Sequence, residues 1–189
     1  MKEADTQFEA AADRDRLAGA VRAALFVALI TVGSYVVIPL PFSPVPVALQ
    51  SGFVLLAAIS LTPKWALTSV ASYLLLGALG LPLFAGGTGG LGHLLGPTGG
   101  YLIAYLPAAA VTSLIAGRSL WSKGSATILG TVVIYAVGVP WLALVQNLSA
   151  PQAISLGMLP FLPGDILKIV VVTAIGETTH AILPREARN

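Results

Sequence analysis

Two charged side chains stand alone in a long apolar stretch of the sequence. Asp165 and Lys168 are the only Asp, Glu, Lys or Arg residues between Lys123 and Glu177. Three residues apart on a helix, they share one face. Charged groups within apolar segments are costly to bury and mark ion pairs or ligand sites. The pair therefore predicts either a structural ion pair, with Asp165 capping the helix, or a site that hydrogen-bonds a polar ligand in an outward-facing cavity.

A glycine-rich run over residues 84–101 is the second candidate feature. Glycine lets backbone amides approach a ligand closely, and the free amides that begin a helix near residue 98 could hold a carboxylate. We expect this run to meet the segment 160–168 in space. The alternative is a tight re-entrant connection without a ligand. The candidate binding residues in the run are Phe84, Gly87, Gly90, Gly99, Gly100 and Tyr101.

Composition sets the class of protein that must position these residues. The mean hydropathy is +0.88, and 56% of residues are hydrophobic while only 10% are charged. A soluble domain carries about a quarter charged residues, so the chain is predicted to be an all-α integral membrane protein. Its few basic residues are scattered singly, which argues against nucleic acid as a partner. No Cys is present, which excludes disulfides and thiolate sites.

Apolar segments and their breakers predict one membrane domain over residues 17–183. Residues 1–16 are expected to form a cytoplasmic tail or short surface helix, and residues 184–189 a cytoplasmic tail. Each span needs roughly 20 apolar residues, although some segments here are shorter. The six expected helices cover about 17–38, 47–61, 65–81, 98–116, 125–144 and 163–183.

Lys and Arg positions predict the orientation of these helices. With the N-terminus inside, the cytoplasmic segments are the two tails and the turns at 62–64 and 117–124. Together with Arg22 at the inner end of the first helix, they hold every Lys and Arg except Lys168. The outer segments at 39–46, 82–97 and 145–162 hold none, as the positive-inside rule requires. Lys168 lies on the outer side and therefore needs a separate reason.

Other functional motifs are missing or weak. The sequence has no GxxxxGK[ST] phosphate loop, so any ATP that drives transport must be hydrolysed by a partner. It has neither a GxSxG nor an HExxH motif. His93 and His180 are expected on opposite sides of the membrane and cannot share a metal. We expect no metal and no cofactor. An enzymatic activity is disfavoured because Asp165 is the only intramembrane carboxylate on the outer side.

Small residues at Ala20, Ala24 and Ala28 follow one stripe of the first helix. Such small-xxx-small spacing permits close contact with a partner helix. Ordinary packing inside the bundle is the alternative explanation.

Four segments carry a specific combination of motifs. They are residues 43–50 (SPVPVALQ), 80–90 (GLPLFAGGTGG), 96–105 (GPTGGYLIAY) and 160–168 (PFLPGDILK). Together they resemble the BioY family, the biotin-specific substrate-binding (S) components of energy-coupling-factor (ECF) transporters. The resemblance extends from about residue 17 to 183.

The resemblance implies a six-helix S-component fold in the plasma (inner) membrane with an outward-facing biotin pocket closed by loops. It implies a transmembrane T component and two ATPase subunits as partners, engaged in part through Ala20, Ala24 and Ala28. ATP would be used only by those partner subunits.

Biotin offers a ureido group, an apolar ring and a carboxylate. We expect Asp165 to accept hydrogen bonds from the ureido N–H groups and Lys168 to donate to the ureido oxygen, although Lys168 could instead bind the carboxylate. The carboxylate is expected near Gly99, Gly100 and Tyr101. Gln50 could add a hydrogen bond, and the ring would rest on residues such as Phe84.

Three alternatives remain open at this point. The chain could be the S component for another vitamin, an intramembrane enzyme that uses Asp165 as acid or base, or a structural membrane subunit without a ligand.

Overall fold

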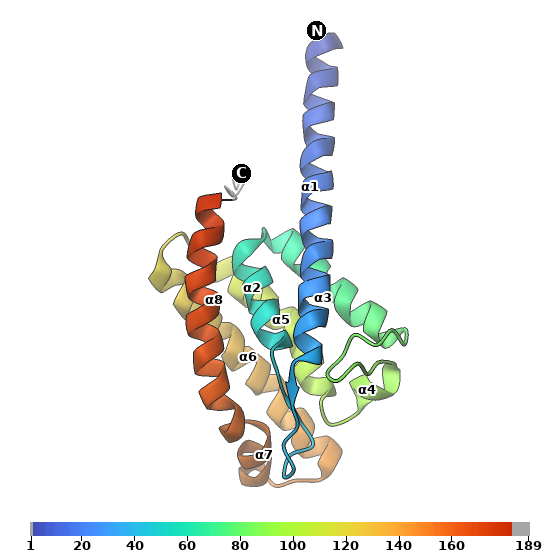
Figure 1. Ribbon diagram of the computed structural model, residues 1–189, viewed down its shortest axis with the longest axis vertical. Coiled ribbons are helices and arrows are strands. Elements are labelled where there is room, and N and C mark those ends of the chain that lie inside the picture. The colour runs from blue at the N-terminus through green and yellow to red at the C-terminus, as the bar shows by residue number, and fades with distance from the viewer. Residues whose placement is uncertain (1, 183–189) are drawn as a thin grey trace.

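The computed structural model describes the backbone of residues 2–182 and the side chains of residues 13–176. The predicted tail 184–189 and the side chains of Glu177 and His180 lie outside these ranges. Helix α1 (Lys2–Tyr35) projects far beyond the rest of the molecule at its N-terminal end (Figure 1). The predicted tail 1–16 is thus continuous with the first membrane helix from Lys2 onward.

The outside of the bundle is apolar, which fits a lipid environment. Large hydrophobic side chains on several helices are strongly exposed, among them Leu25 of α1 at 59%, Leu75 of α3 at 62% and Ile166 of α8 at 63%. A soluble monomer rarely exposes apolar patches on this scale. Within the described residues, the segments 13–35, 120–146 and 150–176 are long and apolar enough to cross a membrane. The prediction of a helical protein with several apolar, membrane-length segments is confirmed, whereas the count of six spans stays a prediction.

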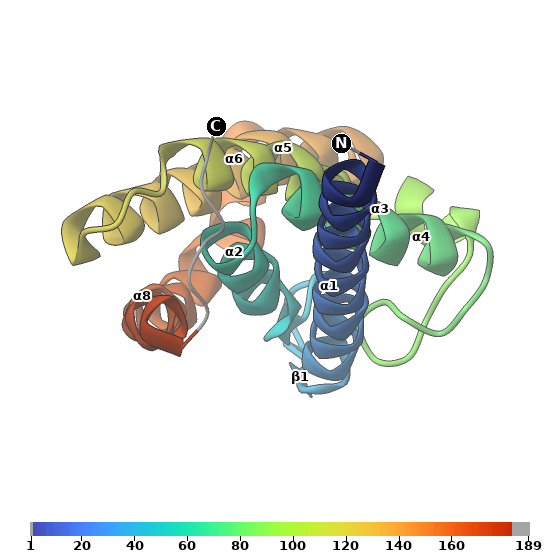
Figure 2. The ribbon, with the colours of Figure 1, turned by 90° about the horizontal axis from the view of Figure 1, so that it is seen from above.

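Helix α2 (Gln50–Ser60) lies at the centre of the bundle, between α1, α8 and the pair α5 and α6 (Figure 2). Its side chains are therefore buried almost all round, including Val54, Ala57 and Ile59. Helix α3 (Pro63–Ala78) begins at Pro63, the first-turn position that proline favours. Helix α5 (Gly99–Ile115) contains Pro107 and packs along both α3 and α6.

The last third of the chain forms a long helix and a returning one. Helix α6 (Leu120–Gln146) begins where the Ser119 side chain accepts a hydrogen bond from the Ser122 amide, and it ends at Asn147, which has a left-handed backbone. Helix α7 (Ala150–Gly157) starts with a capping box formed by Ser149 and Gln152. The 3-10 turn η1 (Leu159–Phe161) then leads into α8 (Leu162–Ile182).

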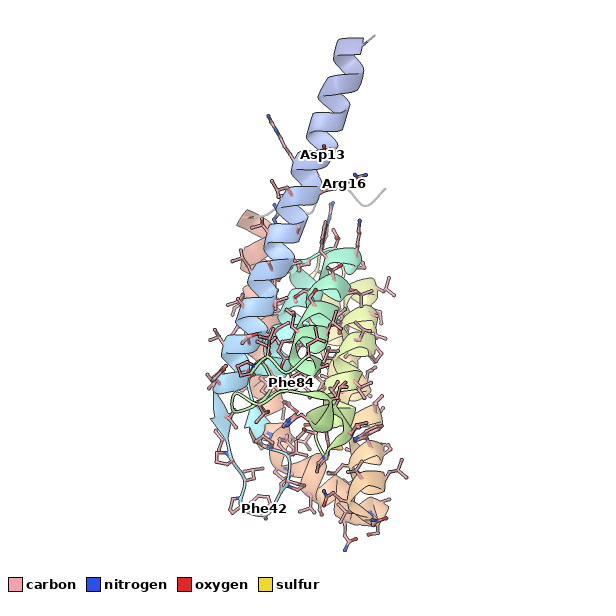
Figure 3. All side chains as sticks on the ribbon, turned by 90° about the vertical axis from the view of Figure 1, so that its right-hand side faces the viewer. Asp13, Arg16, Phe42 and Phe84 are labelled. Carbon is pink, nitrogen blue, oxygen red and sulfur yellow. The ribbon has the colours of Figure 1, made fainter. Side chains whose placement is uncertain are left out.

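The end of the bundle opposite the N-terminus is built from connecting segments. The strands β1 (Val37–Ile38) and β2 (Val47–Ala48) form a two-stranded antiparallel hairpin around residues 39–46. Phe42, at the tip, marks this end, while Asp13 and Arg16 mark the opposite end on the projecting part of α1 (Figure 3). The glycine-rich run contains the short helix α4 (Leu91–Leu95) and a bridge between Phe84 and Thr88. We refer to this end as the loop end.

Several boundaries differ from the sequence-based expectation, and three of the differences have a clear physical cause. The first helix ends at Tyr35, three residues early, because Val37 and Ile38 pair with β2. The connection 145–161 is mostly helical, because Ser149 and Gln152 cap α7. Lys123 does not lie in an exposed turn, since α6 already begins at Leu120 and the Lys123 side chain is fully buried beside Gly176.

A cavity with a charged pair at the loop end

A cavity opens among the helices toward the loop end of the bundle. The empty space between its walls, with the open mouth counted, is about 740 Å3. Residues from both sequence-predicted segments line it, so the expectation that these segments meet is confirmed. The lining residues used below are Gln50, Ser51, His93, Thr98, Tyr101, Tyr105, Tyr135, Asp165 and Lys168.

Asp165 and Lys168 form an ion pair in the wall of this cavity. Lys168 Nζ lies 3.0 Å from Asp165 Oδ1, and the two side chains are only 11% and 13% exposed. The ammonium group also donates to Ser51 Oγ at 3.1 Å, while the Tyr135 hydroxyl donates to Asp165 Oδ2. Ser51 belongs to α2, Tyr135 to α6 and the ion pair itself to α8. Three helices therefore hold the pair in place. A nearly buried pair held in this way is oriented before any ligand arrives.

Gln50 and two tyrosines form a second polar cluster beside the pair. The Tyr73 hydroxyl donates to Gln50 Oε1 at 2.9 Å, and Gln50 Nε2 donates to the Tyr105 hydroxyl at 3.0 Å. Gln50 lies at the first position of α2 and is buried. Both ends of its amide are used, which fixes its orientation in the cavity wall.

Glycines allow the lining side chains to reach their places. A Cβ on Gly138 of α6 would overlap the Tyr101 ring, and one on Gly157 would overlap the Tyr101 hydroxyl. That hydroxyl donates to the Gly157 carbonyl at 2.8 Å. Close contact at these two glycines thus brings Tyr101 into the cavity wall. The stem of Lys168 crosses α2 at Gly52, but an added Cβ there would lie at an ordinary contact distance of 3.5 Å from Lys168 Cγ.

The predicted glycine contacts are not part of the cavity lining. The amides of Gly87, Gly90 and Gly99 donate to the carbonyls of Phe84, Gly77 and Gly96. Gly100 lies where a Cβ would overlap the side chain of Trp141. Contact between these four glycines and a ligand stays a prediction, and the geometry gives them a structural role instead.

Phe84 lies behind the cavity rather than on its surface. It is fully buried and contacts Tyr73 and His93, with ring centroids 5.7 Å apart in both cases. The Phe84 ring therefore supports His93, which reaches the lining from α4 and lies within hydrogen-bonding distance of Thr88 Oγ1. Partial burial lowers the pKa of His93 below its usual value, so the imidazole is neutral at pH 7.

Sequence reasoning missed Tyr135, Tyr105, Tyr73 and Ser51. Tyr101 and Tyr105 are four residues apart and share a helix face, which was a usable signal. Tyr135 is the one hydroxyl-bearing aromatic residue of 125–144, but its pairing with Asp165 depends on how α6 packs against α8. Within the described residues no cluster of His, Asp and Glu side chains could hold a metal ion.

Comparison with known proteins identifies the family. The sequence profile described as "BioY family" matches residues 5–185, which is nearly the whole chain. The chain belongs to the BioY family.

Two similar proteins are named as biotin transporters. One is the probable biotin transporter BioY of Pyrococcus horikoshii, which is 42% identical over 154 residues covering 82% of this chain and 91% of the relative. Another is the biotin transporter BioY of Thermotoga maritima, which is 42% identical over 158 residues with the same coverage.

A solved structure shares the fold. It is the 2.1 Å crystal structure of the S-component for biotin from an ECF-type ABC transporter, with a TM-score of 0.82 and 28% sequence identity. The match covers 89% of this chain and 93% of that chain.

Proposed function

We propose that this BioY protein is the biotin-binding S component of an ECF-type ABC transporter and mediates biotin uptake. One observation carries the proposal: the cavity whose wall holds the Asp165–Lys168 pair lies in a fold similar to that of a solved biotin S-component. The names of its relatives support the same ligand.

The pair suits the ureido group of biotin. A carboxylate has about four lone-pair sites, and Asp165 uses two of them for Tyr135 and Lys168. The other two can accept the ureido N–H groups. Lys168 carries three N–H donors and uses two of them for Asp165 and Ser51, so the third can donate to the ureido oxygen.

The carboxylate of biotin would then extend toward the loop end. His93 and Thr98 line the cavity, and we propose that they replace the glycine amides as its polar partners. The Tyr101 hydroxyl already donates its proton to the Gly157 carbonyl, so Tyr101 would contribute its ring. In the alternative orientation Lys168 binds the carboxylate.

The proposed membrane arrangement has six spans with both termini in the cytoplasm. The projecting part of α1 then lies on the cytoplasmic side and the loop end faces outward. We place the protein in the plasma (inner) membrane, where a T component and two ATPase subunits would bind it. ATP is used by those subunits and the S component itself holds no cofactor.

Binding of labelled biotin to the purified protein tests the proposal. Wild type should bind saturably, and the double variant D165N/K168A should bind at least about 100-fold more weakly, since hydrogen bonds to charged groups contribute about 1.5–3 kcal/mol each. The matched control is D13N/R16A, which removes an exposed pair with the same i, i+3 spacing on α1 and should bind like wild type. Equal binding by both double variants would place the site elsewhere.

A folded wild type that binds no biotin would favour another vitamin or a structural subunit.

A further inference from the structure

An apolar groove runs along the outside of the bundle between α3 and α5, away from the central cavity. Its volume is about 870 Å3, its open side included. The lining comes from Leu67, Thr68 and Ala71 of α3 and from Leu106, Pro107 and Ala110 of α5.

Small side chains create this groove within a longer apolar strip. Ala71 and Ala110 contribute only methyl groups to its walls. Leu75, four residues after Ala71, and Leu114, four residues after Ala110, are 62% and 68% exposed. Between Leu67 and Leu75 the strip rises about 12 Å along α3. It is therefore long, narrow and apolar, as a hydrocarbon chain requires.

One cation stands at the end of the groove. Lys64 precedes Leu67, Thr68 and Ala71 by three, four and seven residues, so it shares their face of α3. Its side chain is exposed, and Thr68 Oγ1 donates to the Lys64 carbonyl at 2.9 Å. The groove thus begins one helical turn from an ammonium group.

The neighbouring tryptophan places this cation at the depth of lipid headgroups. Lys64 Nζ lies 5.2 Å from the centre of the Trp65 ring. That ring packs against α1 at Gly19, where a Cβ would overlap it. Tryptophan favours the boundary between hydrocarbon and water. The groove then extends from the headgroup layer into the hydrocarbon of the same leaflet.

We propose that this groove binds an acyl chain of an anionic phospholipid whose phosphate pairs with Lys64. Arg22 of α1 and Arg118, in the turn between α5 and α6, add positive charge at the same end of the bundle. Asp13 lies on the projecting part of α1 (Figure 3). Basic pockets between membrane helices bind anionic headgroups in this way. A lipid fits better than a protein helix because the groove ends at a cation at headgroup depth.

Native mass spectrometry of the full chain tests the site. The protein is purified in detergent with phosphatidylglycerol or with phosphatidylcholine of the same acyl chains, and the retained lipid is counted. Wild type should retain phosphatidylglycerol about five-fold more strongly, the preference expected from one lysine near the headgroup layer. Lys64→Gln should remove this preference. Ala110→Leu should fill the groove and lower the retention of both lipids.

Matched variants distinguish lipid binding at this groove from non-specific attraction between anionic lipid and any basic side chain. Arg16→Gln removes a positive charge from the projecting part of α1 and should keep the preference. Ala71→Leu provides a groove-filling variant on the other wall, and the thermal unfolding midpoint reports whether each variant folds. Equal retention of the two lipids by wild type would overturn the proposal, as would equal losses in Lys64→Gln and Arg16→Gln. A groove-filling variant that changes the oligomeric state but not lipid retention would assign the groove to a second copy of the chain.

Discussion

Asp165 accepts hydrogen bonds from two helices while it is almost buried. Tyr135 of α6 and Lys168 of α8 both donate to it. Removing one partner of a buried charge pair leaves the other without compensation, which is more costly than loss of the contact alone. Single substitutions here are therefore expected to change both ligand affinity and stability, so the two must be measured separately.

Lys168→Ala distinguishes the two orientations of biotin. If Lys168 donates to the ureido oxygen, the substitution should weaken binding of biotin and of its methyl ester by similar factors, about 10-fold or more. If it binds the carboxylate, biotin should lose far more affinity than the ester. Competition against labelled biotin measures both ratios. Ser125→Ala removes an exposed hydroxyl that donates to the Ser122 carbonyl near the far end of α6, and it should leave both affinities unchanged.

His93 predicts how binding depends on pH. Its pKa is lowered by partial burial, so it gains a positive charge only at a pH below the usual range of histidine. Biotin affinity should therefore rise as the pH falls through this lowered pKa, because the imidazolium attracts the carboxylate, whereas the affinity of the methyl ester should not rise. In His93→Gln the two ligands should show the same pH profile. A wild-type profile identical for acid and ester would remove His93 from the carboxylate site.

The lowered pKa of His93 also affects the stability of the ligand-free protein. The unfolded state binds a proton at a higher pH than folded His93 does, so stability from this group is present above the unfolded pKa and is lost as the pH falls through the folded pKa. The thermal unfolding midpoint of wild type should drop over this range more than that of His93→Gln.

At the scale of elements, the glycine-rich run is a folded connection. The Gly86 amide donates to the Ser34 carbonyl at 2.9 Å, and the Tyr35 hydroxyl donates to the Pro82 carbonyl at 2.7 Å. These contacts tie the run and the residues just before it to the end of α1. Gly87 and Gly90 have φ angles of 74° and 94°, which side chains rarely adopt. The run thus holds α4 and His93 against the cavity.

Gly90→Ala should destabilise the protein without removing any ligand contact. The φ of 94° and ψ of 159° at Gly90 lie in a region that costs other residues about 1–3 kcal/mol. The thermal unfolding midpoint should fall and biotin affinity should weaken as α4 shifts. Gly92→Ala is the control, since its φ is not positive and an added Cβ would meet open space. Equal effects of both substitutions would contradict this explanation.

At the scale of the whole molecule, α1 presents two different faces. Gly19, Ala23 and Ile30 are buried against the bundle, whereas Ala20, Ala24 and Ala28 are exposed. Internal packing, the alternative explanation for the alanine stripe, is therefore wrong. The exposed stripe remains available for close contact with another membrane helix, and its binding to a T component stays a prediction.

Ala24→Leu should reduce biotin uptake without changing biotin affinity. The larger side chain would separate α1 from a closely packed partner helix, while the cavity lies elsewhere. Uptake by cells that hold the partner subunits and binding to the purified protein provide the two measurements. Ala136→Leu makes the same change at an exposed alanine of α6 and should leave uptake intact. Normal uptake in Ala24→Leu would remove the stripe from the interface.

The sequence by itself determined the class of protein, most of its helices and the charged pair. Hydropathy and the positions of prolines and glycines act over short stretches, so they are readable without a structure. Asp165 and Lys168 were identifiable for the same reason, since charges in an apolar helix stand out and their i, i+3 spacing fixes their mutual position.

Only the tertiary structure decided which other residues share the cavity. Tyr135, Ser51 and His93 lie far from Asp165 in sequence, and their convergence depends on how α6, α2 and α4 pack. The structure also showed that Gly87, Gly90 and Gly99 lie behind the cavity lining, where their amides already donate to nearby carbonyls. Glycine spacing indicates that a backbone must bend or approach closely, whereas the group it approaches is set by packing between distant segments.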